Sequence, residues 1–522
     1  MFRPMIPAVV LAALVSTACS APDDPPGPAT YYVSASGDDS ASGRAPDTAW
    51  RSLARATSQD LAPGDTVVLT GGRPLAGSLR LTAADGGDAR DPVRITGDEN
   101  FPGINAEGHA GIDITDTSGV IVDNLAIRVD DPGREGTNGV LVTASRGSGI
   151  HRGITLESIT VEGAYQGVAV GAEQPGDGLR NVTVDRVRVT DAVRNGIITY
   201  GTPAPDFSLA DVSITDSAVT GTRGIPGVQT NTGSGIVVGS ADGALVEGNE
   251  ASHNGALADA PEGPIGIWTH DSRDVVIRDN VSHHNRTQWT DGGGFGVDIS
   301  TTDTLVERNL SHDNAGSGYL VYTRAGGLPT GRVTVRYNAS VGDAWHDQLP
   351  AAMSVLGGLT STDPGTFVHD IHVHHNTVIP SDGTDSTALL LMGTVENLTV
   401  HHNIFDVSGG RGPAVRVSDW NGVGSLRFAA NHLSADGGLL DREGLLVEEV
   451  GGLGDVFPGA AANVHEPVDY RDPGDLPRGL APLRPLTADI PVPPDPTDAE
   501  KDLLGAPVTE PNPMIGAVSV HG

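Results

Sequence analysis

The sequence predicts an all-β protein built as a parallel β-solenoid, in which each repeat buries its apolar face only by stacking on its neighbours. Two observations carry this prediction. Residues 263–323 contain two successive copies of one repeat and the start of a third, each with a short apolar strand ending in Asn (VVIRDN, TLVERN), a polar corner (SHHN, SHDN), a glycine and a second short strand (GIWTH, GVDIS, GYLVY). Glycine is abundant, at 70 residues, whereas aromatic residues make up 4%, which suits short strands and turns better than helical packing.

The coils can be counted along the chain. Positions that end a predicted strand fall at eleven points: Asn124, Ser158, Arg186, Ser217, Asn249, Asn280, Asn309, Asn338, Asn376, Asn403 and Asn431. They span 307 residues (431 − 124) over ten intervals, which is near 31 residues per coil. At ~4.8 Å per stacked strand, these intervals predict a rod of about 48 Å, and the whole solenoid should hold eleven or more coils.

The recurring asparagines have a structural explanation. Asn tolerates left-handed backbone, and its amide can hydrogen-bond the next Asn of a stack. We therefore expect a buried amide ladder at one corner of the solenoid.

The N-terminus predicts export. Residues 1–19 contain one Arg, an apolar run and a small-residue stretch that ends at Cys19, and residues 20–30 form a Pro/Asp-rich flexible tether. Ser16-Thr17-Ala18-Cys19 resembles the lipobox of bacterial lipoprotein signals, although Ser16 stands where that family usually has Leu. The resemblance implies a protein anchored to the bacterial cell surface by lipid at Cys19, with plain secretion as the alternative. Cys19 is the only cysteine, so no intrachain disulfide can form.

Both ends of the solenoid need covering, because an open coil exposes its core and its strand edge. Helical character in SLARATSQ and the turn-strand PGDTVVLT, inside residues 31–72, resemble the N-terminal cap of secreted right-handed parallel β-helix proteins of the pectate-lyase-like class. The stretch ending in PMIGAVSV resembles their closing segment. The resemblance implies a right-handed parallel β-helix with its cap over residues 31–435 and a C-terminal capping segment over residues 436–522.

Charge excludes some partners. The net charge is −34, which argues against nucleic acid because phosphates need a basic footprint. It would also repel polyanionic sugars unless a basic patch or bound cations intervened. A membrane contact is expected only through the N-terminal lipid, and the protein is expected to be a monomer.

The second strand of each coil carries the candidate site. Aligning Gly266 with Gly296 puts Trp268, His270, Asp298 and Tyr322 on one outward face, within about two rung spacings. In this alignment a carboxylate at position 298 replaces the apolar or aromatic residues Ile198, Val237, Trp268 and Leu320 of other coils. Asp271, Trp289, Asp291 and Arg324 lie on the adjoining corners. A solvated surface carboxylate is the simpler alternative for Asp298.

This combination suits sugar chemistry. Aromatic faces stack on pyranose rings, which assigns substrate binding to Trp268 and Trp289, together with Arg324. Carboxylates act as acid, base or nucleophile in glycoside hydrolysis. The leading hypothesis is a polysaccharide-cleaving glycoside hydrolase that uses Asp291 and Asp298, with His270, Asp271 and Tyr322 as further candidate catalytic residues.

Two other classes stay open. A polysaccharide lyase or C5-epimerase would need His270, Tyr322 or an arginine as its base, because the only lysine is Lys501 in the terminal segment. Residues 265–271 (IGIWTHD) share Gly, His and Asp with the mannuronan C5-epimerase motif Tyr-Gly-Phe-Asp-Pro-His-Asp but lack its first Tyr, its first Asp and its Pro. A non-catalytic rod that binds glycan or spaces other proteins is the third class.

No cofactor is predicted and no metal ligand is assigned. An acidic corner such as Asp291 could hold Ca²⁺, although no EF-hand pattern is present. His372, His374 and His401 fall on one outer face and could bind a transition metal. The same stripe reads Arg278, Glu307, Arg336, His374, His401, and a solvated ladder of alternating charges explains it better.

Overall fold

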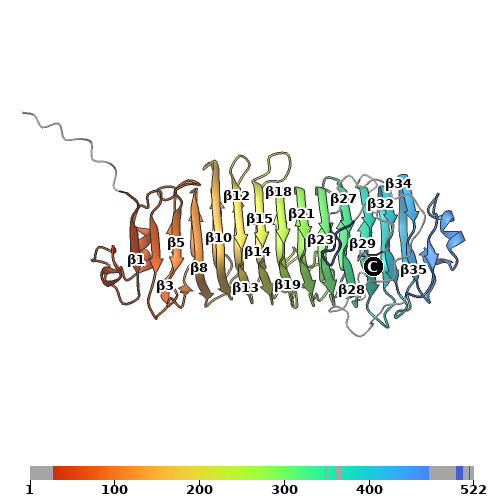
Figure 1. The fold of residues 1–522 in the computed structure, drawn as a ribbon, viewed down its shortest axis with the longest axis horizontal. Helices are drawn as coiled ribbons and strands as arrows, with labels where there is room; N and C mark the ends of the chain where they lie inside the picture. Colours follow the sequence, from red (N-terminus) through yellow and green to blue (C-terminus); the bar gives the residue numbers. More distant parts are fainter. Residues whose placement is uncertain (1–26, 347–349, 359–365, 469–500, 509–515, 518–522) are drawn as a thin grey trace, which may run out of the picture.

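The computed structural model describes residues 27–346, 350–358, 366–468, 501–508 and 516–517, and this part of the chain forms one elongated rod (Figure 1). Successive coils stack along the rod from the first strand to the last, so the predicted parallel β-solenoid is confirmed. The predicted signal segment with Cys19, residues 20–26 of the predicted tether and much of the predicted C-terminal capping segment lie outside the described residues.

The coils contribute parallel strands to three stacks that run along the rod. The first stack comprises β1 (Thr30–Val33), β2 (Thr66–Leu69), β5 (Val93–Gly97), β8 (Val120–Val129), β10 (Ile150–Glu162), β12 (Gly178–Asp185), β15 (Leu209–Thr215), β18 (Ala241–Glu247), β21 (Arg273–Arg278), β24 (Thr302–Glu307), β27 (Thr330–Arg336), β30 (Val368–His374), β32 (Thr387–His401) and β34 (Val415–Ala429). The second stack comprises β3 (Leu75–Gly77), β6 (Ile104–Ala106), β13 (Arg188–Thr190), β16 (Ala218–Thr220), β19 (Glu250–Ser252), β22 (Val281–His283), β25 (Leu310–His312), β28 (Ala339–Asp343), β31 (Thr377–Pro380), β33 (Ile404–Asp406), β35 (His432–Ser434) and β38 (Val464–His465).

The third stack carries the candidate site. It comprises β4 (Leu79–Leu81), β7 (Ala110–Thr115), β9 (Asn138–Ala144), β11 (Gln166–Ala172), β14 (Asn195–Tyr200), β17 (Ser234–Gly239), β20 (Ile265–His270), β23 (Gly293–Val297), β26 (Tyr319–Tyr322), β29 (Ala351–Leu356) and β36 (Leu440–Arg442). The long strands β8 and β10 continue from the first stack into the second, and β32 and β34 continue from the third into the first. β37 (Leu445–Val447) pairs antiparallel with β36.

The core runs the length of the rod as columns of apolar side chains. One column of the first stack, at most 2% exposed, consists of partners on successive coils: Ile95, Val122, Leu156, Val184, Ile214, Val246, Ile277, Val306, Val335, Val373, Val400 and Phe428. Burying one such side chain contributes about 1.5–3 kcal/mol. The rod is therefore stabilised coil by coil, through contacts between neighbours.

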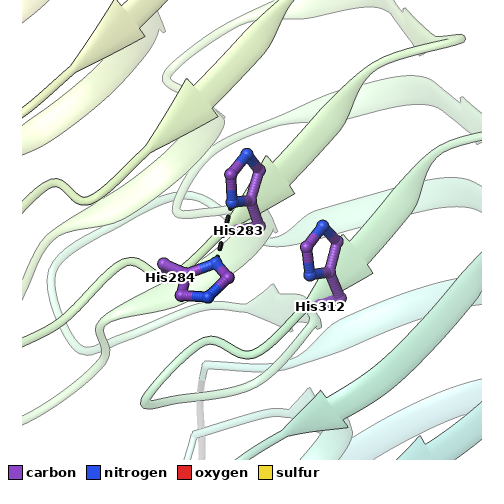
Figure 2. A group of neighbouring side chains, drawn as sticks. All are labelled: His283, His284 and His312. Atoms are coloured by element: carbon purple, nitrogen blue, oxygen red, sulfur yellow. Dashed lines mark hydrogen bonds between the residues drawn. The ribbon is translucent and has the colours of Figure 1, made fainter. Parts of the chain in front are cut away.

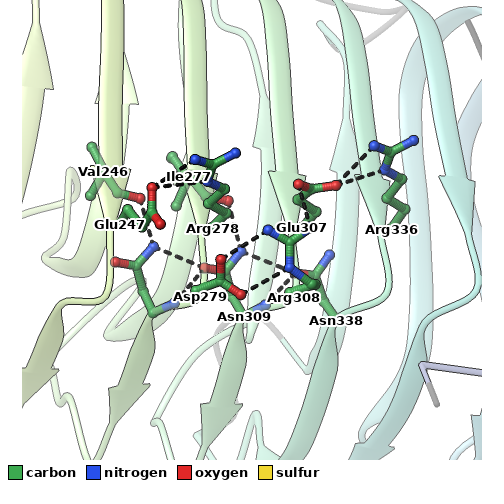
Figure 3. Close-up of polar contacts among 11 residues, drawn as sticks. Val246, Glu247, Ile277, Arg278, Asp279, Glu307, Arg308, Asn309, Arg336 and Asn338 are labelled. Carbon is green, nitrogen blue, oxygen red and sulfur yellow. Dashed lines mark hydrogen bonds and ion pairs between the residues drawn. The ribbon is translucent and has the colours of Figure 1, made fainter. Parts of the chain in front are cut away.

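The predicted amide ladder is present and buried (Figure 3). Asn309 is typical: its Oδ1 accepts from the Asn280 backbone N–H (3.0 Å) and Nδ2 (2.9 Å), and its own Nδ2 donates to the Ile277 carbonyl (2.9 Å). The same bonds link Asn249, Asn280, Asn309, Asn338, Asn376, Asn403, Asn431 and Asn463. Each amide thus satisfies backbone groups that the turn would otherwise leave buried without partners.

The reason given for these asparagines was half wrong. The left-handed backbone lies one residue before them, at Asp279 (φ 58°) and Arg308 (φ 54°). These positions therefore favour Asn because its amide can hydrogen-bond the neighbouring coil, and not because Asn tolerates a left-handed backbone. Asn124 is itself the left-handed residue of its corner (φ 53°). At the later corner near residue 217, the left-handed residue is Asp216 (φ 48°), so the counted position Ser217 lies one residue after it.

The charge ladder has the predicted register but is not solvated throughout. Arg278, Glu307, Arg336, His374 and His401 are partners on successive coils. Glu307 and Arg336 form a 2.9 Å ion pair (Figure 3) although they are 4% and 2% exposed, and His374 and His401 are as deeply buried. The expectation of a solvated ladder therefore fails beyond Arg278, because these charges sit paired in a closed corner.

Short helical segments cover the two ends. η1 (Pro46–Thr48) and α1 (Leu53–Thr57) lie beside the first coils, where Trp50 is fully buried and stacks on Tyr31 with ring centroids 4.9 Å apart. At the other end, η2 (Val450–Asp455) precedes Phe457, which stacks on Phe428 of the core at 4.8 Å. Within the described part of the chain, no helix is long and apolar enough to cross a membrane.

Candidate active site

A cavity of about 490 Å³ opens on the outer face of the third stack. Its lining comes from β14, β17, β20 and β26, from the residues that directly follow β23, and from the loops at residues 230–231, 261–263 and 290–291. Seven of the eight predicted catalytic and binding residues line it: Trp268, His270, Asp271, Asp291, Asp298, Tyr322 and Arg324. Trp289 does not line it, since it lies on a neighbouring corner with 55% of its surface exposed.

The predicted alignment of these strands was wrong by two residues. Trp268 pairs with Gly296 and Thr269 with Val297, so Asp298 is the counterpart of His270 and not of Trp268. Val297 pairs in turn with Val321 on the next coil, so Tyr322 is the counterpart of Asp298 there. Because side chains alternate with a period of two, this slip left Asp298 and Tyr322 on their predicted outward face, where both line the cavity.

Asp298 is the most perturbed carboxyl in the cavity. It directly follows β23, its backbone N–H donates to the Thr269 carbonyl (2.8 Å), and its Oδ1 accepts from the Ile299 N–H (2.6 Å). Burial raises the pKa of Asp298 from 3.8 to about 7, and the charge of Asp291 adds to the rise. A carboxyl with this pKa can carry or release a proton near neutral pH.

Asp291 approaches from the corner that precedes β23. Its backbone is left-handed (φ 60°), and its Oδ2 accepts from the Gly263 N–H (2.9 Å). Burial raises the pKa of Asp291 to about 6. Gly263 has no room for a side chain, since a Cβ there would lie 1.9 Å from the Thr290 carbonyl oxygen.

Tyr322 lines the cavity from the coil that follows Asp298. Burial raises its pKa to about 12, and the charges of Asp298 and Asp291 contribute to the rise. Tyr322 therefore stays protonated, as a phenol that can donate a hydrogen bond to a carboxylate or to a ligand. A phenol with a raised pKa is a weaker candidate for the base of a lyase than the sequence analysis assumed.

His270 lines the cavity beside Asp271. Its Nδ1 lies 2.9 Å from Asp271 Oδ2, and its ring is tilted against Trp268 at 5.0 Å. The ring lies over Gly239 of the preceding coil, where a Cβ would come within 2.6 Å of His270 Nε2. His270 and Asp271 therefore form one unit on the cavity wall.

Trp268 is a wall and not the exposed platform that was expected. It is 8% exposed, and its Nε1 donates to Ser234 Oγ (3.1 Å), which donates in turn to Asn231 Oδ1 (3.0 Å). Its outward position does not expose it, because a second apolar cluster forms outside the core and covers it. That cluster includes Val237, Ile265, Trp268, Leu320, Leu356 and Leu390.

Several lining residues, Glu262 among them, were not predicted from the sequence. Arg324 forms an ion pair with Glu262, and both side chains are about two-fifths exposed at the mouth (42% and 43%). Glu262, Arg194 and Asn195 also line the cavity. Glu262 belongs to a Pro/Gly loop outside the repeat, so no periodicity could have singled it out.

The cavity offers no evident metal site. Among the described residues, a group of three potential ligands within reach of one ion occurs only at His283, His284 and His312, which do not line it. The histidine stripe considered from the sequence is not an open face: His374 and His401 stack at 4.9 Å but are buried, and His372 is half-buried.

Comparison with known proteins agrees with the fold. Residues 110–339 match the family model described as a right-handed β-helix region, in agreement with the right-handed parallel β-helix fold of the described residues. No curated protein sequence matches the chain.

Solved structures of similar fold are distant in sequence. The GH136 lacto-N-biosidase from Eubacterium ramulus is similar over 84% of this chain and 68% of its own, with 17% identity and a TM-score of 0.50. The periplasmic alginate epimerase AlgG (12% identity, 78% of this chain and 79% of its own, TM-score 0.38) and the Dettilon tailspike protein (14%, 70% and 63%, TM-score 0.45) are less similar in structure. At these identities, the similarity extends to the fold alone.

Proposed function

We propose that the protein is a glycoside hydrolase that cleaves a saccharide in the cavity of the third stack. The observation that carries this proposal is the pair Asp291 and Asp298, two carboxyls at one cavity with pKa values raised to about 6 and about 7. Glycoside hydrolysis needs one carboxyl to protonate the leaving oxygen and a second, ionised one to attack the sugar or to activate water. With these pKa values, one carboxyl can be ionised while the other still holds its proton near neutral pH.

The walls support a sugar as the ligand. Tyr322, half-buried in the cavity lining, offers aromatic surface that can pack against the apolar face of a pyranose ring, and the largely buried Trp268 adds apolar lining. The volume lies within the range of pockets that enclose a compact ligand, about 300–1,000 Å³, so the end of a chain or a short oligosaccharide fits better than a long polymer. One protein of similar fold is also a glycoside hydrolase by name.

Charge favours a neutral sugar. Four carboxyls line the cavity, from Glu262, Asp271, Asp291 and Asp298, against two guanidinium groups. One of the two, that of Arg324, is already paired with Glu262. With a net charge of −34 on the whole chain, a polyuronate would be repelled.

A saccharide panel tests the proposal. New reducing ends and the ultraviolet absorbance of unsaturated uronides would be followed together, for the wild-type protein, Asp298→Ala and a control, Asp274→Asn, at an exposed corner. Reducing ends without absorbance, lost in Asp298→Ala and kept in the control, are expected. Absorbance would mean a lyase, and binding without turnover on any substrate would mean a non-catalytic glycan-binding rod.

We also propose that the protein is exported and held at the cell surface through Cys19. The support is the sequence of residues 1–19 alone, and the saccharide would then be met outside the cell.

A further inference from the structure

Three histidines converge on a corner of the second stack (Figure 2). His283 ends β22 and His312 ends β25, and the two are partners on adjacent coils with parallel rings 4.6 Å apart. His284 follows His283 and turns its ring toward it, so that the two Nδ1 atoms lie 2.8 Å apart.

We propose that His283, His284 and His312 form a binding site for a divalent transition-metal ion of the zinc class. Each imidazole offers one ring nitrogen, and the three nitrogens all lie within 4.8 Å of one another. Imidazole nitrogens are preferred ligands of Zn²⁺, Ni²⁺ and Cu²⁺. All three side chains are only half-buried, so an ion can reach them from solvent.

The geometry needs little change to accept an ion. Zn–N bonds of about 2.0–2.1 Å in a tetrahedral site place neighbouring nitrogens about 3.3 Å apart. The Nδ1 atoms of His283 and His284 would open by about half an ångström, and the ion would replace the proton that they share. A side-chain rotation of His312 completes the set, which leaves a fourth position for water or a carboxylate.

Two carboxylates flank the histidines as a metal site requires. Glu250 Oε1 lies 3.2 Å from His283 Nε2, and Asp313 Oδ2 lies 2.8 Å from His312 Nδ1. When Glu250 accepts the Nε2 proton of His283, the lone pair of that ring is left on Nδ1, where His284 faces it. Such carboxylate–histidine contacts orient ligating rings and offset the charge of the ion.

A packed histidine ladder is the simpler explanation, and the chain contains one for comparison. His374, His375, His401 and His402 also stack in consecutive pairs, with Nδ1 atoms 2.8 and 2.9 Å apart. That ladder is at most 4% exposed and therefore closed to solvent. The corner at His283 differs because it is accessible and has two acidic neighbours.

The repeats themselves supply substitutions that should fold. Ser252 occupies the position of His283 on the preceding coil, and Val341 occupies that of His312 on the next. The test variants are therefore His283→Ser, His312→Val and the double variant. His369→Asn is the control, since His369 lies 2.8 Å from Asp370 much as His312 lies near Asp313 but belongs to no such histidine group.

The experiment is a titration of the chelator-treated, tag-free full-length chain with ZnCl₂ by calorimetry, followed by Co²⁺ absorption spectra. One equivalent of Zn²⁺ is expected to bind with micromolar affinity or better and to raise the melting temperature. Each single variant should weaken binding at least tenfold and the double variant should abolish it, whereas His369→Asn should bind normally. No saturable binding, or equal binding by the double variant, would overturn the proposal, and a cobalt–thiolate band would assign the ion to Cys19 instead.

Discussion

Asp298 occupies on its coil the position that His270 occupies on the coil before it. Tyr322 follows in the same column, so an imidazole, a carboxyl and a phenol stand on three consecutive rungs at ~4.8 Å spacing. The solenoid places three different chemical groups in register by changing one residue per coil. This column, with Asp291 from the adjoining corner, holds the proposed chemistry.

The two carboxyls can be assigned their roles by azide rescue. Asp291→Gly and Asp298→Gly should each lower turnover of a good substrate by 10³-fold or more while leaving the melting curve cooperative. If the enzyme is retaining, azide should restore activity in both: loss of the nucleophile gives a glycosyl azide of inverted configuration, and loss of the acid/base gives the retained one. Rescue in neither would indicate an inverting enzyme, and full activity in either variant would contradict the proposed pair.

Activity should depend on pH as the carboxyl pair titrates. One carboxyl must be ionised and the other protonated, and the pKa values of about 6 and about 7 place that state near pH 6–7. We expect kcat/KM to fall below pH 6, as the ionised partner gains a proton, and above pH 7, as the donor loses its proton. A rate that rises steadily to pH 9 would point instead to a deprotonated base of high pKa.

Asp343 should make the fold less stable at alkaline pH. A second amide ladder runs through Asn254, Asn285 and Asn314 and ends at the fully buried Asp343, whose Oδ1 accepts from the Asn314 N–H and Nδ2 (2.9 Å each). Burial raises the pKa of Asp343 from 3.8 to about 7. The folded state thus binds this proton more tightly than the unfolded chain, so stability is lost as pH rises from about 4 to about 7.

Asp343→Asn extends the amide ladder without the charge. Urea melts at pH 8 should show it to be more stable than the wild type by about 2–4 kcal/mol, with little difference at pH 4. The control is Asp313→Asn at an exposed corner. Equal stability of Asp343→Asn and the wild type at pH 8 would contradict the raised pKa.

The amide ladder should be energetically uneven. Asn309→Ala removes bonds to the backbone and side chain of Asn280 and to the Ile277 carbonyl, all in a fully buried site, and should destabilise by about 3–5 kcal/mol. Asn463→Ala, at the half-exposed end of the ladder, should cost about 1–2 kcal/mol. Thermal unfolding of both variants, monitored by circular dichroism, measures the difference.

Cys19 should decide where the protein is found. In a bacterial host, Cys19→Ala is expected to abolish incorporation of labelled palmitate and to move the protein from the membrane fraction to a soluble one. Ser20→Ala, one residue further on, serves as the control. An unchanged distribution in Cys19→Ala would favour secretion without a lipid anchor.

The sequence predicted the fold well because the solenoid repeats its information. The spacing of the asparagines and the alternation at positions such as Val275 and Ile277 recur along the coils. A coil that departs from the pattern can therefore be placed from its neighbours. The alignment of the strand at Asp298 was wrong by two residues. A shift by two keeps each side chain on the same face, so the alternation of apolar residues cannot reveal it. It left the side chains outward and the cavity membership intact.

The cavity itself was harder to predict. Trp268 was expected to be exposed because strand alternation predicts which face a side chain points to, but not whether other residues cover it there. Ile265, Leu320 and residues of more distant coils cover it. Glu262 and Arg194 come from loops that obey no repeat. The pKa values of Asp291 and Asp298 follow from that three-dimensional burial, which no local pattern records.

The amide ladder gives the rod a direction of assembly. The Oδ1 atom of each Asn accepts from the preceding coil, while its own backbone N–H donates to the Asn of the coil that follows. A newly added coil therefore completes the one before it and presents two unfilled donors, the backbone N–H and the Nδ2 of its Asn, to the next. A chain that emerges N-terminus first can close its coils in the order in which they arrive, each serving as the template for its successor.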